Sequence, residues 1–204
     1  MTTISLIRHG LVENPGQVYY GRLPGFSLAE EGRRQAAAAG DYLAGQPIVA
    51  ICHSPMLRAR QTAEIVRHHC LATAPLVECG LLNEIHSTYD GRPIAEMEQI
   101  DWNFYREVTP PFEKPEDVLN RIVRFFDWAR REHPGAHVVG VSHADPIAFA
   151  ILWASGRPLT ADQRKQLMEC GIPDSYPAPA SVTSFTFADQ AGDGLVDFCY
   201  FAPA

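Results

Sequence analysis

Short apolar runs alternate with helix-like stretches along the chain. Residues 3–8, 47–53 and 136–142 are rich in Val and Ile and are bounded by turn residues, a pattern typical of strands buried on both faces of a parallel sheet. Residues 57–69 and 115–132 have helical patterns. Strands that alternate with helices predict an α/β fold, a three-layer α/β/α sandwich with a mostly parallel central sheet.

The stretch at 27–45, SLAEEGRRQAAAAGDYLAG, carries the clearest helical signals. Ser27 is placed to be the N-cap, and Glu30 completes a capping box. The alanines favour helix, and Gly45 lies where a C-terminal stop belongs. The sequence therefore predicts a helix that starts just after Ser27 and ends before Gly45.

The chain shows neither an internal repeat nor a low-complexity tract. At 204 residues it is long enough to bury one substantial core, so we expect a single domain over residues 1–204. Residues 86–115 hold aromatic side chains among acids and prolines, a composition that suits a lid or the wall of a substrate pocket. We expect this segment to be an insertion that helps to choose the substrate.

Charge and cysteine content narrow the set of partners. Lys and Arg number 17 against 24 Asp and Glu, and the resulting net charge of −7 argues against nucleic acid and against a membrane surface as partners. The N-terminus lacks the pattern of a secretory signal. Five cysteines without a C-x-x-C pair favour reduced thiols over disulfides or a zinc site, so we expect a cytoplasmic protein. The sequence leaves a homodimer open.

Reactive side chains follow all three predicted strands. Arg8 and His9 end the first strand, Arg58 comes shortly after the second, and His143 and Ala144 follow the third. In open α/β sheets, ligands bind in the crevice outside the carboxyl ends of the strands. We therefore expect the two arginines and the two histidines to converge there, with Ala144 in the same turn, and to bind a tetrahedral dianion.

Glu84, in the stretch LLNEIHSTYDG, supplies a carboxyl group for the same site. A neutral imidazole can attack phosphorus, arginine can hold phosphoryl oxygens, and a carboxylic acid can protonate the departing oxygen. These groups suffice for hydrolysis of a small phosphorylated molecule with no metal and no cofactor. Gly10 permits close backbone approach, so that a backbone carbonyl can hold one ring nitrogen of His9 and fix the tautomer of the other.

Three neighbouring features have simpler interpretations. Arg60 fits a helix surface better than a second phosphate ligand. The RHHC stretch at 67–70 fits a solvated helix face, because adjacent helical residues point about 100° apart and do not readily share one ion. Asp145 either orients His143 or caps the following helix, and Pro146 in the first turn favours the cap.

Five motifs follow one another along most of the chain: LIRHG at 6–10, GRLPGFSLAEEGRRQA at 21–36, SPMLRARQTA at 54–63, LNEIHSTYDG at 82–91 and VVGVSHADPIAFAIL at 138–152. In this order they resemble the histidine phosphatase superfamily, also called the phosphoglycerate mutase-like family. The resemblance implies the three-layer fold. It also implies that His9 becomes phosphorylated, that Arg8, Arg58 and His143 hold the phosphoryl group, and that Glu84 is the proton donor.

Departures from the family pattern concern substrate contacts. The family carries a hydroxyl three residues past the histidine and an asparagine further on, and these neighbourhoods here hold Val12 and Asn14, which makes Asn14 a candidate phosphate contact. The stretch after Glu84 lacks the ERHYG of the glycolytic mutases and resembles the phosphatase branch, with Tyr89 as its aromatic residue. Arg22, in YYGRLPG, is a candidate partner for a second anionic group on the substrate, with a surface ion pair as the alternative.

The favoured interpretation is a phosphatase that hydrolyses a phosphomonoester through a phosphohistidine intermediate on His9. Three alternatives stay open. A phosphoglycerate-type mutase would share the catalytic residues and retain the phosphoryl group. A phosphohistidine-protein phosphatase would act on a protein partner, and a non-enzymatic phosphate-sensing domain would bind without turnover. Fold alone does not choose among these.

Overall fold

A six-stranded sheet forms the centre of the molecule, and the computed structural model describes residues 1–188 and 194–203 of the chain. The strand order is β3-β2-β4-β1-β5-β6. The first four of these are mutually parallel, and β5 and β6 add an antiparallel edge. The strands are β1 (Thr2–Arg8), β2 (Ile48–His53), β3 (Leu76–Glu78), β4 (His137–Ser142), β5 (Val182–Phe187) and β6 (Leu195–Phe201).

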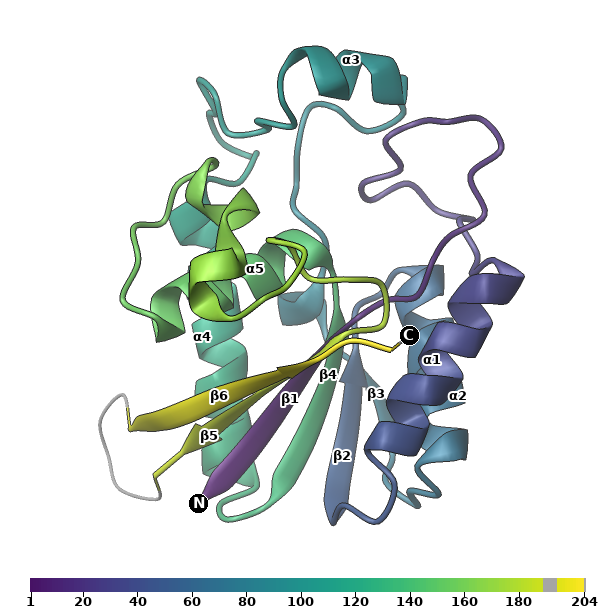
Figure 1. Cartoon of the computed structure of the whole chain (residues 1–204), viewed down its shortest axis with the longest axis vertical. Helices are drawn as coiled ribbons and strands as arrows, with labels where there is room; N and C mark the ends of the chain where they lie inside the picture. The colour runs from purple at the N-terminus through teal and green to yellow at the C-terminus, as the bar shows by residue number, and fades with distance from the viewer. Residues whose placement is uncertain (189–193, 204) are drawn as a thin grey trace.

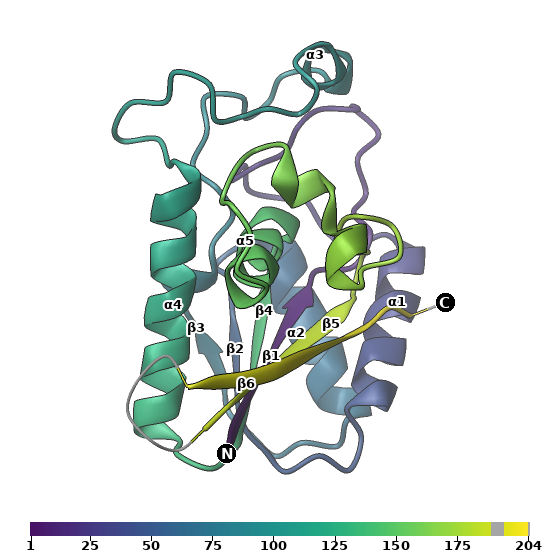
Figure 2. The same cartoon turned by 60° about the vertical axis from the view of Figure 1, so that its left-hand side comes forward.

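Helices cover both faces of the sheet, which gives the three layers that the sequence predicts (Figures 1 and 2). One face carries α1 (Glu30–Tyr42) and α2 (Leu57–His69), and the other carries α4 (Pro115–Glu132) and α5 (Ala144–Ala154). Side chains alternate along each strand. Leu6 of β1 therefore packs in the core on the α4 and α5 side, while its neighbour Ile7 packs in the core on the α1 and α2 side.

Three parallel strands end level with one another. Arg8 of β1 lies opposite Ser142 of β4, and His53 of β2 lies opposite Val141. The residues that follow these strands therefore emerge at one edge of the sheet. Around this edge run the loops that follow β1, β3 and α5, with the short helix α3 (Ile94–Gln99) above them (Figure 1).

The buried strands and two of the helices agree closely with the sequence prediction. The strands predicted at 3–8, 47–53 and 136–142 match β1, β2 and β4 to within one residue at each end, and the helices predicted at 57–69 and 115–132 match α2 and α4. A continuous apolar run is a strong signal for a strand that is buried on both faces. The antiparallel hairpin of β5 and β6 and the three-residue β3 were not predicted.

The predicted start of the first helix is wrong. Helix α1 begins at Glu30, its N-cap is Ala29, and no side chain caps it. Leu28 instead pairs in an antiparallel bridge with Val12, and Ala29 N–H donates to the Leu11 carbonyl at 2.9 Å. This pairing keeps Ser27 and Leu28 extended, so Ser27 is not the cap and Glu30 does not complete a capping box. At the other end Gly45 has a left-handed φ of 79°, beyond the last helical turn, as the prediction of a stop requires.

None of the helices in the described ranges is both long enough and apolar enough to span a bilayer.

Candidate active site

His9 lies immediately after β1, at the carboxyl edge of the sheet. Its Nδ1 is 2.8 Å from the carbonyl oxygen of Gly10, which can only accept a hydrogen bond. Nδ1 therefore carries the proton, and Nε2 carries the lone pair. The tautomer is fixed by a backbone carbonyl, as predicted from the sequence. A Cβ on Gly10 would stand 2.3 Å from the carbonyl oxygen of Gly32 in α1, so this turn needs glycine to pack against the helix.

The surroundings of His9 keep its imidazole neutral. The side chain is buried, and this burial lowers the pKa of His9 well below its ordinary value. The cations of Arg58 and Arg8 lower the pKa further, and the hydrogen bond to Gly10 opposes them. A neutral imidazole with a lone pair on Nε2 is the form that can act as a nucleophile.

Two arginines place positive charge beside His9. Arg58, in the first turn of α2, donates from Nη2 to the carbonyl of Gly21 at 2.7 Å. Arg8 donates from Nη1 to the carbonyl of Pro177 at 2.6 Å. Among the described residues, neither Nε–H group has a hydrogen-bond partner, although both are buried. Buried donors without partners are costly, and an anion between the two guanidinium groups would satisfy them.

His143 faces His9, with 5.2 Å between the ring centroids. Its Nδ1 lies 3.2 Å from Nη2 of Arg58, which can only donate, so Nδ1 accepts and Nε2 donates to Ser54 Oγ at 2.8 Å. Burial lowers the pKa of His143 well below its ordinary value, and Arg58 adds to this effect. Ala144 is the first residue of α5 and lines the cavity. Its backbone N–H belongs to a helix N-terminus, where anions are favoured.

Glu84 lies across the cluster, just after the 3₁₀ turn Gly80–Leu82. Its Oε2 is 3.4 Å from Nδ1 of His143 and 3.8 Å from Nη2 of Arg58. Burial raises the pKa of Glu84 to about 7, although the Arg58 cation opposes the shift. The carboxyl group is therefore protonated in a large fraction of molecules near neutral pH, which is the state that a general acid needs.

Two arginines donate hydrogen bonds to the backbone carbonyl of Glu84. Arg22 Nε donates to the Glu84 carbonyl at 2.8 Å, and Arg121 Nη2 donates to the same oxygen at 3.2 Å. The carboxylate of Glu113 binds both arginines, at 2.9 and 2.7 Å, and also accepts from the backbone N–H of His86 at 2.8 Å. We call Arg22, Glu113 and Arg121 the Glu84 clamp.

The clamp changes the interpretation of Arg22 and adds a residue that sequence reasoning missed. Arg22 does not line the cavity, and its guanidinium is committed to Glu84 and Glu113 rather than directed at a second anionic group. The residue missed is Arg121, although its position in the sequence indicates a buried partner. It lies on the apolar face of α4, three residues after Val118 and four before Phe125, where an unpaired arginine would be costly.

Two other residues from the sequence analysis lie outside the cluster. Asn14 donates from Nδ2 to the Val18 carbonyl at 2.9 Å and accepts from the Val18 N–H at 3.3 Å. Both polar atoms of its amide thus bind within its own loop, and Nδ2 keeps a second N–H, so the phosphate contact of Asn14 stays a prediction. Arg60 is exposed on α2 and pairs with Glu64 at 2.9 Å, as a helix-surface residue would.

Asp145 does not cap helix α5. No side chain caps this helix, and the Asp145 carboxylate instead accepts hydrogen bonds from the hydroxyls of Tyr105, at 2.6 Å, and Tyr176. Arg164 Nε completes an ion pair with Asp145 at 3.2 Å. The favoured interpretation as a cap was therefore wrong, because three side chains from distant segments occupy the carboxylate.

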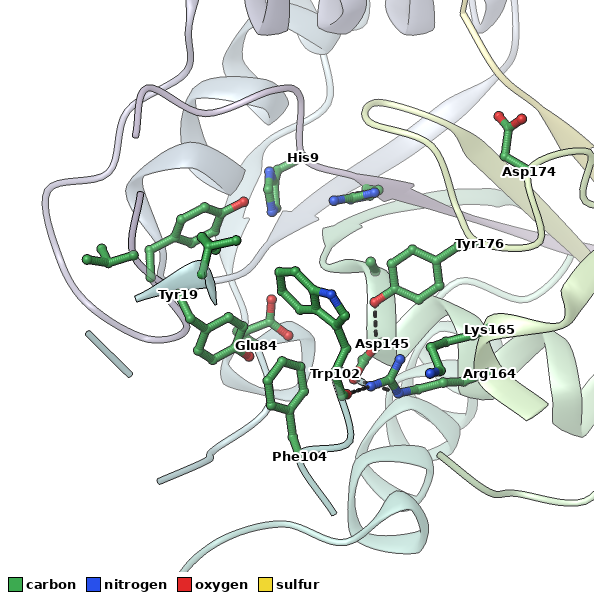
Figure 3. A pocket seen from close by; sticks show the side chains of 15 residues that line it. His9, Tyr19, Glu84, Trp102, Phe104, Asp145, Arg164, Lys165, Asp174 and Tyr176 are labelled. Atoms are coloured by element: carbon green, nitrogen blue, oxygen red, sulfur yellow. Dashed lines mark hydrogen bonds and ion pairs between the residues drawn. The ribbon is translucent and has the colours of Figure 1, made fainter. Parts of the chain in front are cut away.

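One cavity of about 500 Å³ lies beside this cluster (Figure 3). His9, Arg8, Glu84 and Ala144 line it, and we call this part of the cavity its inner part and the rest its outer part; Arg58 and His143 are buried and are not among the lining residues. The remaining wall is largely aromatic and comes from the loop after β1, from the segment between Glu84 and α4, and from the segment after α5. Its members include Tyr19, Tyr20, Trp102, Phe104 and Tyr176, together with Asp145, Arg164, Lys165 and Asp174.

Within residues 1–188 and 194–203, one group of side chains has ligand atoms close enough to share a metal ion. It is the cluster itself: the atoms of His9, Glu84 and His143 all lie within 4.8 Å of one another. The RHHC stretch forms no such group. The predicted solvated helix face holds for part of this stretch: Arg67 and His68 are exposed and His69 Nδ1 lies 3.0 Å from Asp41 Oδ1 on α1, whereas Cys70 is buried in the core.

The raised pKa of Glu84 predicts a gain in stability for Glu84→Gln that depends on pH. The folded state raises this pKa from 4.5 to about 7, so ionisation of Glu84 opposes folding, fully above pH 7 and not at all below pH 4.5. At about 1.4 kcal/mol per pKa unit, Glu84→Gln should be more stable than the parent by roughly 3 kcal/mol at about pH 8 and similar to it at about pH 4.5. Urea unfolding at both pH values measures this. A stability difference that is the same at both would contradict the assigned pKa.

The fold and the cluster together define an α/β protein with a histidine–arginine site at the carboxyl edge of its sheet. A family model of the histidine phosphatase superfamily (branch 1) matches residues 4–176, and the chain belongs to this superfamily. The uncharacterized protein Rv0525 of Mycobacterium tuberculosis is 37% identical over 208 residues, which cover 100% of this chain and 97% of that protein.

Solved structures share the fold over nearly the whole chain. YhfR from Bacillus stearothermophilus has a TM-score of 0.76 and 24% identity, and the match covers 99% of this chain and 95% of that chain. The mycobacterial glucosyl-3-phosphoglycerate phosphatase Rv2419c has a TM-score of 0.73 and 20% identity, with coverage of 98% and 97%. At these identities the likeness concerns the fold.

Proposed function

We propose that this protein is a phosphatase that hydrolyses a phosphomonoester through a phosphohistidine intermediate on His9. One observation carries the proposal: a neutral imidazole faces a protonatable carboxyl group across a cationic site, with Nδ1 of His9 fixed by Gly10 and the pKa of Glu84 raised to about 7. A nucleophile and an acid on opposite sides of a phosphoryl group are what in-line transfer needs.

In the first step, Nε2 of His9 attacks phosphorus and forms a P–N bond while the P–O bond to the alcohol breaks. Glu84 gives its proton to the departing oxygen, so the alcohol leaves neutral. Arg8, Arg58 and the N-terminus of α5 at Ala144 stabilise the phosphoryl oxygens during transfer. In the second step, the Glu84 carboxylate takes a proton from water, whose oxygen attacks phosphorus. The P–N bond then breaks and inorganic phosphate leaves.

The charge of the cluster supports chemistry without a metal ion. The trio of His9, Glu84 and His143 has the spacing of a metal site, but Nδ1 of His143 already accepts from Arg58 at 3.2 Å. The two arginine cations would also repel a divalent ion. We therefore extend the proposal to a metal-independent hydrolase.

The five cysteines are free thiols, which suits a reducing compartment, so we also propose a cytoplasmic location.

Turnover should survive an excess of chelator. The test uses a panel of phosphomonoesters and measures inorganic phosphate and free alcohol together, with and without chelator. We expect phosphate and alcohol in equal amounts and rates that chelator does not change, because Arg8 and Arg58 supply the charge that a metal would otherwise supply. Loss of turnover in chelator that a divalent ion restores would contradict metal independence.

The same measurement separates the alternatives. A mutase would yield an isomerised ester with little free phosphate, and a phosphate-sensing domain would bind esters without releasing alcohol. A phosphohistidine-protein phosphatase would leave the small esters intact and act on a phosphorylated protein. The phosphatase is favoured over a sensing domain because His9 and Glu84 supply a nucleophile and an acid to one cavity, and over a mutase because the stretch after Glu84 lacks the ERHYG of the glycolytic mutases.

A further inference from the structure

The outer part of the cavity holds a cluster of aromatic side chains centred on Phe104. The ring of Phe104 stacks on Tyr19 with 4.5 Å between centroids, and Trp102 meets it edge-on at 6.1 Å. Figure 3 shows these side chains gathered around the same cavity as His9 and Glu84. A wall of this kind binds flat apolar groups, because stacked and edge-on arrangements between aromatic rings are favourable.

Trp102 is held in this wall by an uncommon backbone conformation. Asp101 and Trp102 have φ values of 50° and 54°, in the left-handed region that non-glycine residues rarely adopt. Two cations hold this turn: Lys165 Nζ donates to the Asp101 carbonyl at 2.8 Å, and Arg164 donates to the Trp102 carbonyl. Such conformations persist where the surroundings enforce them, and they concentrate at ligand sites.

The same two cations are neutralised by carboxylates of the protein. Arg164 pairs with Asp145 at 3.2 Å, and Lys165 pairs with the carboxylate of Asp101 at 2.6 Å. Asp174 lines the cavity as a further acid and is exposed. A second anionic group on a substrate would therefore have to displace an internal carboxylate and would also face Asp174.

The inner part of the cavity differs in this respect. Arg8 forms no ion pair with a carboxylate among the described residues, and its buried Nε–H lacks a hydrogen-bond partner there; Arg164 also has a buried Nε–H without such a partner, but Asp145 neutralises its charge. The inner part thus has positive charge available to bind an anion. In the outer part the cations are already paired with carboxylates, which favours an uncharged group. The volume of about 500 Å³ lies in the range of sites that hold molecules with one or more rings, and it exceeds what a three-carbon acid needs.

We propose that the alcohol portion of the substrate is an uncharged aromatic or heteroaromatic group, selected by Trp102, Phe104 and Tyr19. This inference rests on the proposed phosphatase function. It names the chemical class of the ester, and it disfavours phosphorylated carboxylic acids and bisphosphates. Binding energy from the ring would orient the phosphorus against His9, so the selection is expected in kcat/KM.

The test compares esters whose leaving alcohols have similar acidity. Benzyl phosphate and pyridylmethyl phosphate carry a ring, cyclohexylmethyl phosphate carries an apolar group that is not aromatic, and ethyl phosphate carries neither. 3-Phosphoglycerate and O-phosphoserine carry a carboxylate. We expect kcat/KM for the two aromatic esters to exceed that for the carboxylate esters and for ethyl phosphate by at least about tenfold, with the cyclohexyl ester in between.

Matched variants assign the preference to the wall. Trp102→Leu should lower the ratio of kcat/KM between benzyl and ethyl phosphate by about tenfold. Trp128→Leu removes a partly buried indole of α4 that does not line the cavity, and it should leave this ratio unchanged. If Trp102→Leu fails to fold, the exposed Asp174 offers a second variant. Asp174→Asn should raise kcat/KM for 3-phosphoglycerate severalfold more than for benzyl phosphate, because it removes a like charge.

The outcomes separate this inference from the function on which it rests. Higher kcat/KM for the carboxylate esters than for the aromatic esters, or an unchanged benzyl-to-ethyl ratio in folded Trp102→Leu, overturns the inference alone. Release of phosphate from none of the esters, with no label on His9, overturns the phosphatase function and the inference with it.

Discussion

His9→Ala is expected to abolish turnover, with a loss of about 10⁴-fold or more and a fold that stays intact. The substitution removes Nε2, which is the atom proposed to form the P–N bond. Rapid quench with labelled ester should show an acid-labile phosphoenzyme in the parent and none in the variant. An acid-stable adduct in the parent would point to another nucleophile.

His53 provides a matched control for this experiment. It is the last residue of the parallel strand β2, it is buried, and its Nδ1 is 2.9 Å from the carbonyl oxygen of the next residue, Ser54. It does not line the cavity. His53→Ala should therefore retain the phosphoenzyme and most of the turnover. If both variants lose the label to the same extent, the loss reflects damage to the strand ends and not removal of the nucleophile.

Glu84→Ala is expected to affect esters according to their leaving group. Protonation matters most for a poor leaving group such as an alkoxide, and least for nitrophenolate, which leaves readily without a proton. We expect a loss of about 10²–10⁴-fold on an alkyl phosphate and a clearly smaller loss on nitrophenyl phosphate. Single-turnover measurements are needed, because slow dephosphorylation of His9 would mask the chemical step.

The pH dependence gives an independent measure of the same role. Glu84 must be protonated to act as the acid, so the single-turnover rate on the alkyl ester should fall as pH rises through about 7, the pKa of this group. On nitrophenyl phosphate this decline should be weak.

The lowered pKa of His9 keeps its imidazole neutral at pH values below 6.5, the ordinary pKa of histidine, so the rate should not fall as pH decreases through that value. Equal losses on both esters, with no difference in pH profile, would mean that Glu84 shapes the pocket.

The parallel core of the fold could be predicted because its signals are local. A strand buried on both faces is a continuous apolar run, and β1, β2 and β4 have such runs. The start of α1 depends instead on the pairing of Leu28 with Val12, a contact that capping preferences do not contain. Strand β5 contains buried and partly buried polar residues between its apolar ones, and β6 is partly buried or exposed along its whole length without regular alternation, so both give a weaker signal.

The candidate site also contains residues that could be predicted from local signals and residues that could not. His9, Arg58 and His143 follow strand ends, and the topology of parallel sheets brings strand ends together, so their convergence follows from the order of elements. The Glu84 clamp joins Arg22, Glu113 and Arg121 across three segments of the chain, and no local pattern relates them. Asp145 was misassigned for the same reason, since its partners Tyr105, Arg164 and Tyr176 come from distant positions.

Trp102 and Phe104 lie between α3 and α4, in a segment that contributes no strand to the sheet, whereas His9 and His143 directly follow strands. The strand ends that position His9 and His143 therefore do not include Trp102 and Phe104, which we propose to contact the alcohol portion of the ester. In evolutionary terms, the two parts can change at different rates. Insertions and substitutions between α3 and α4 can produce enzymes for new esters while the strand ends keep the same chemistry, so relatives with the same nucleophile need not share a substrate.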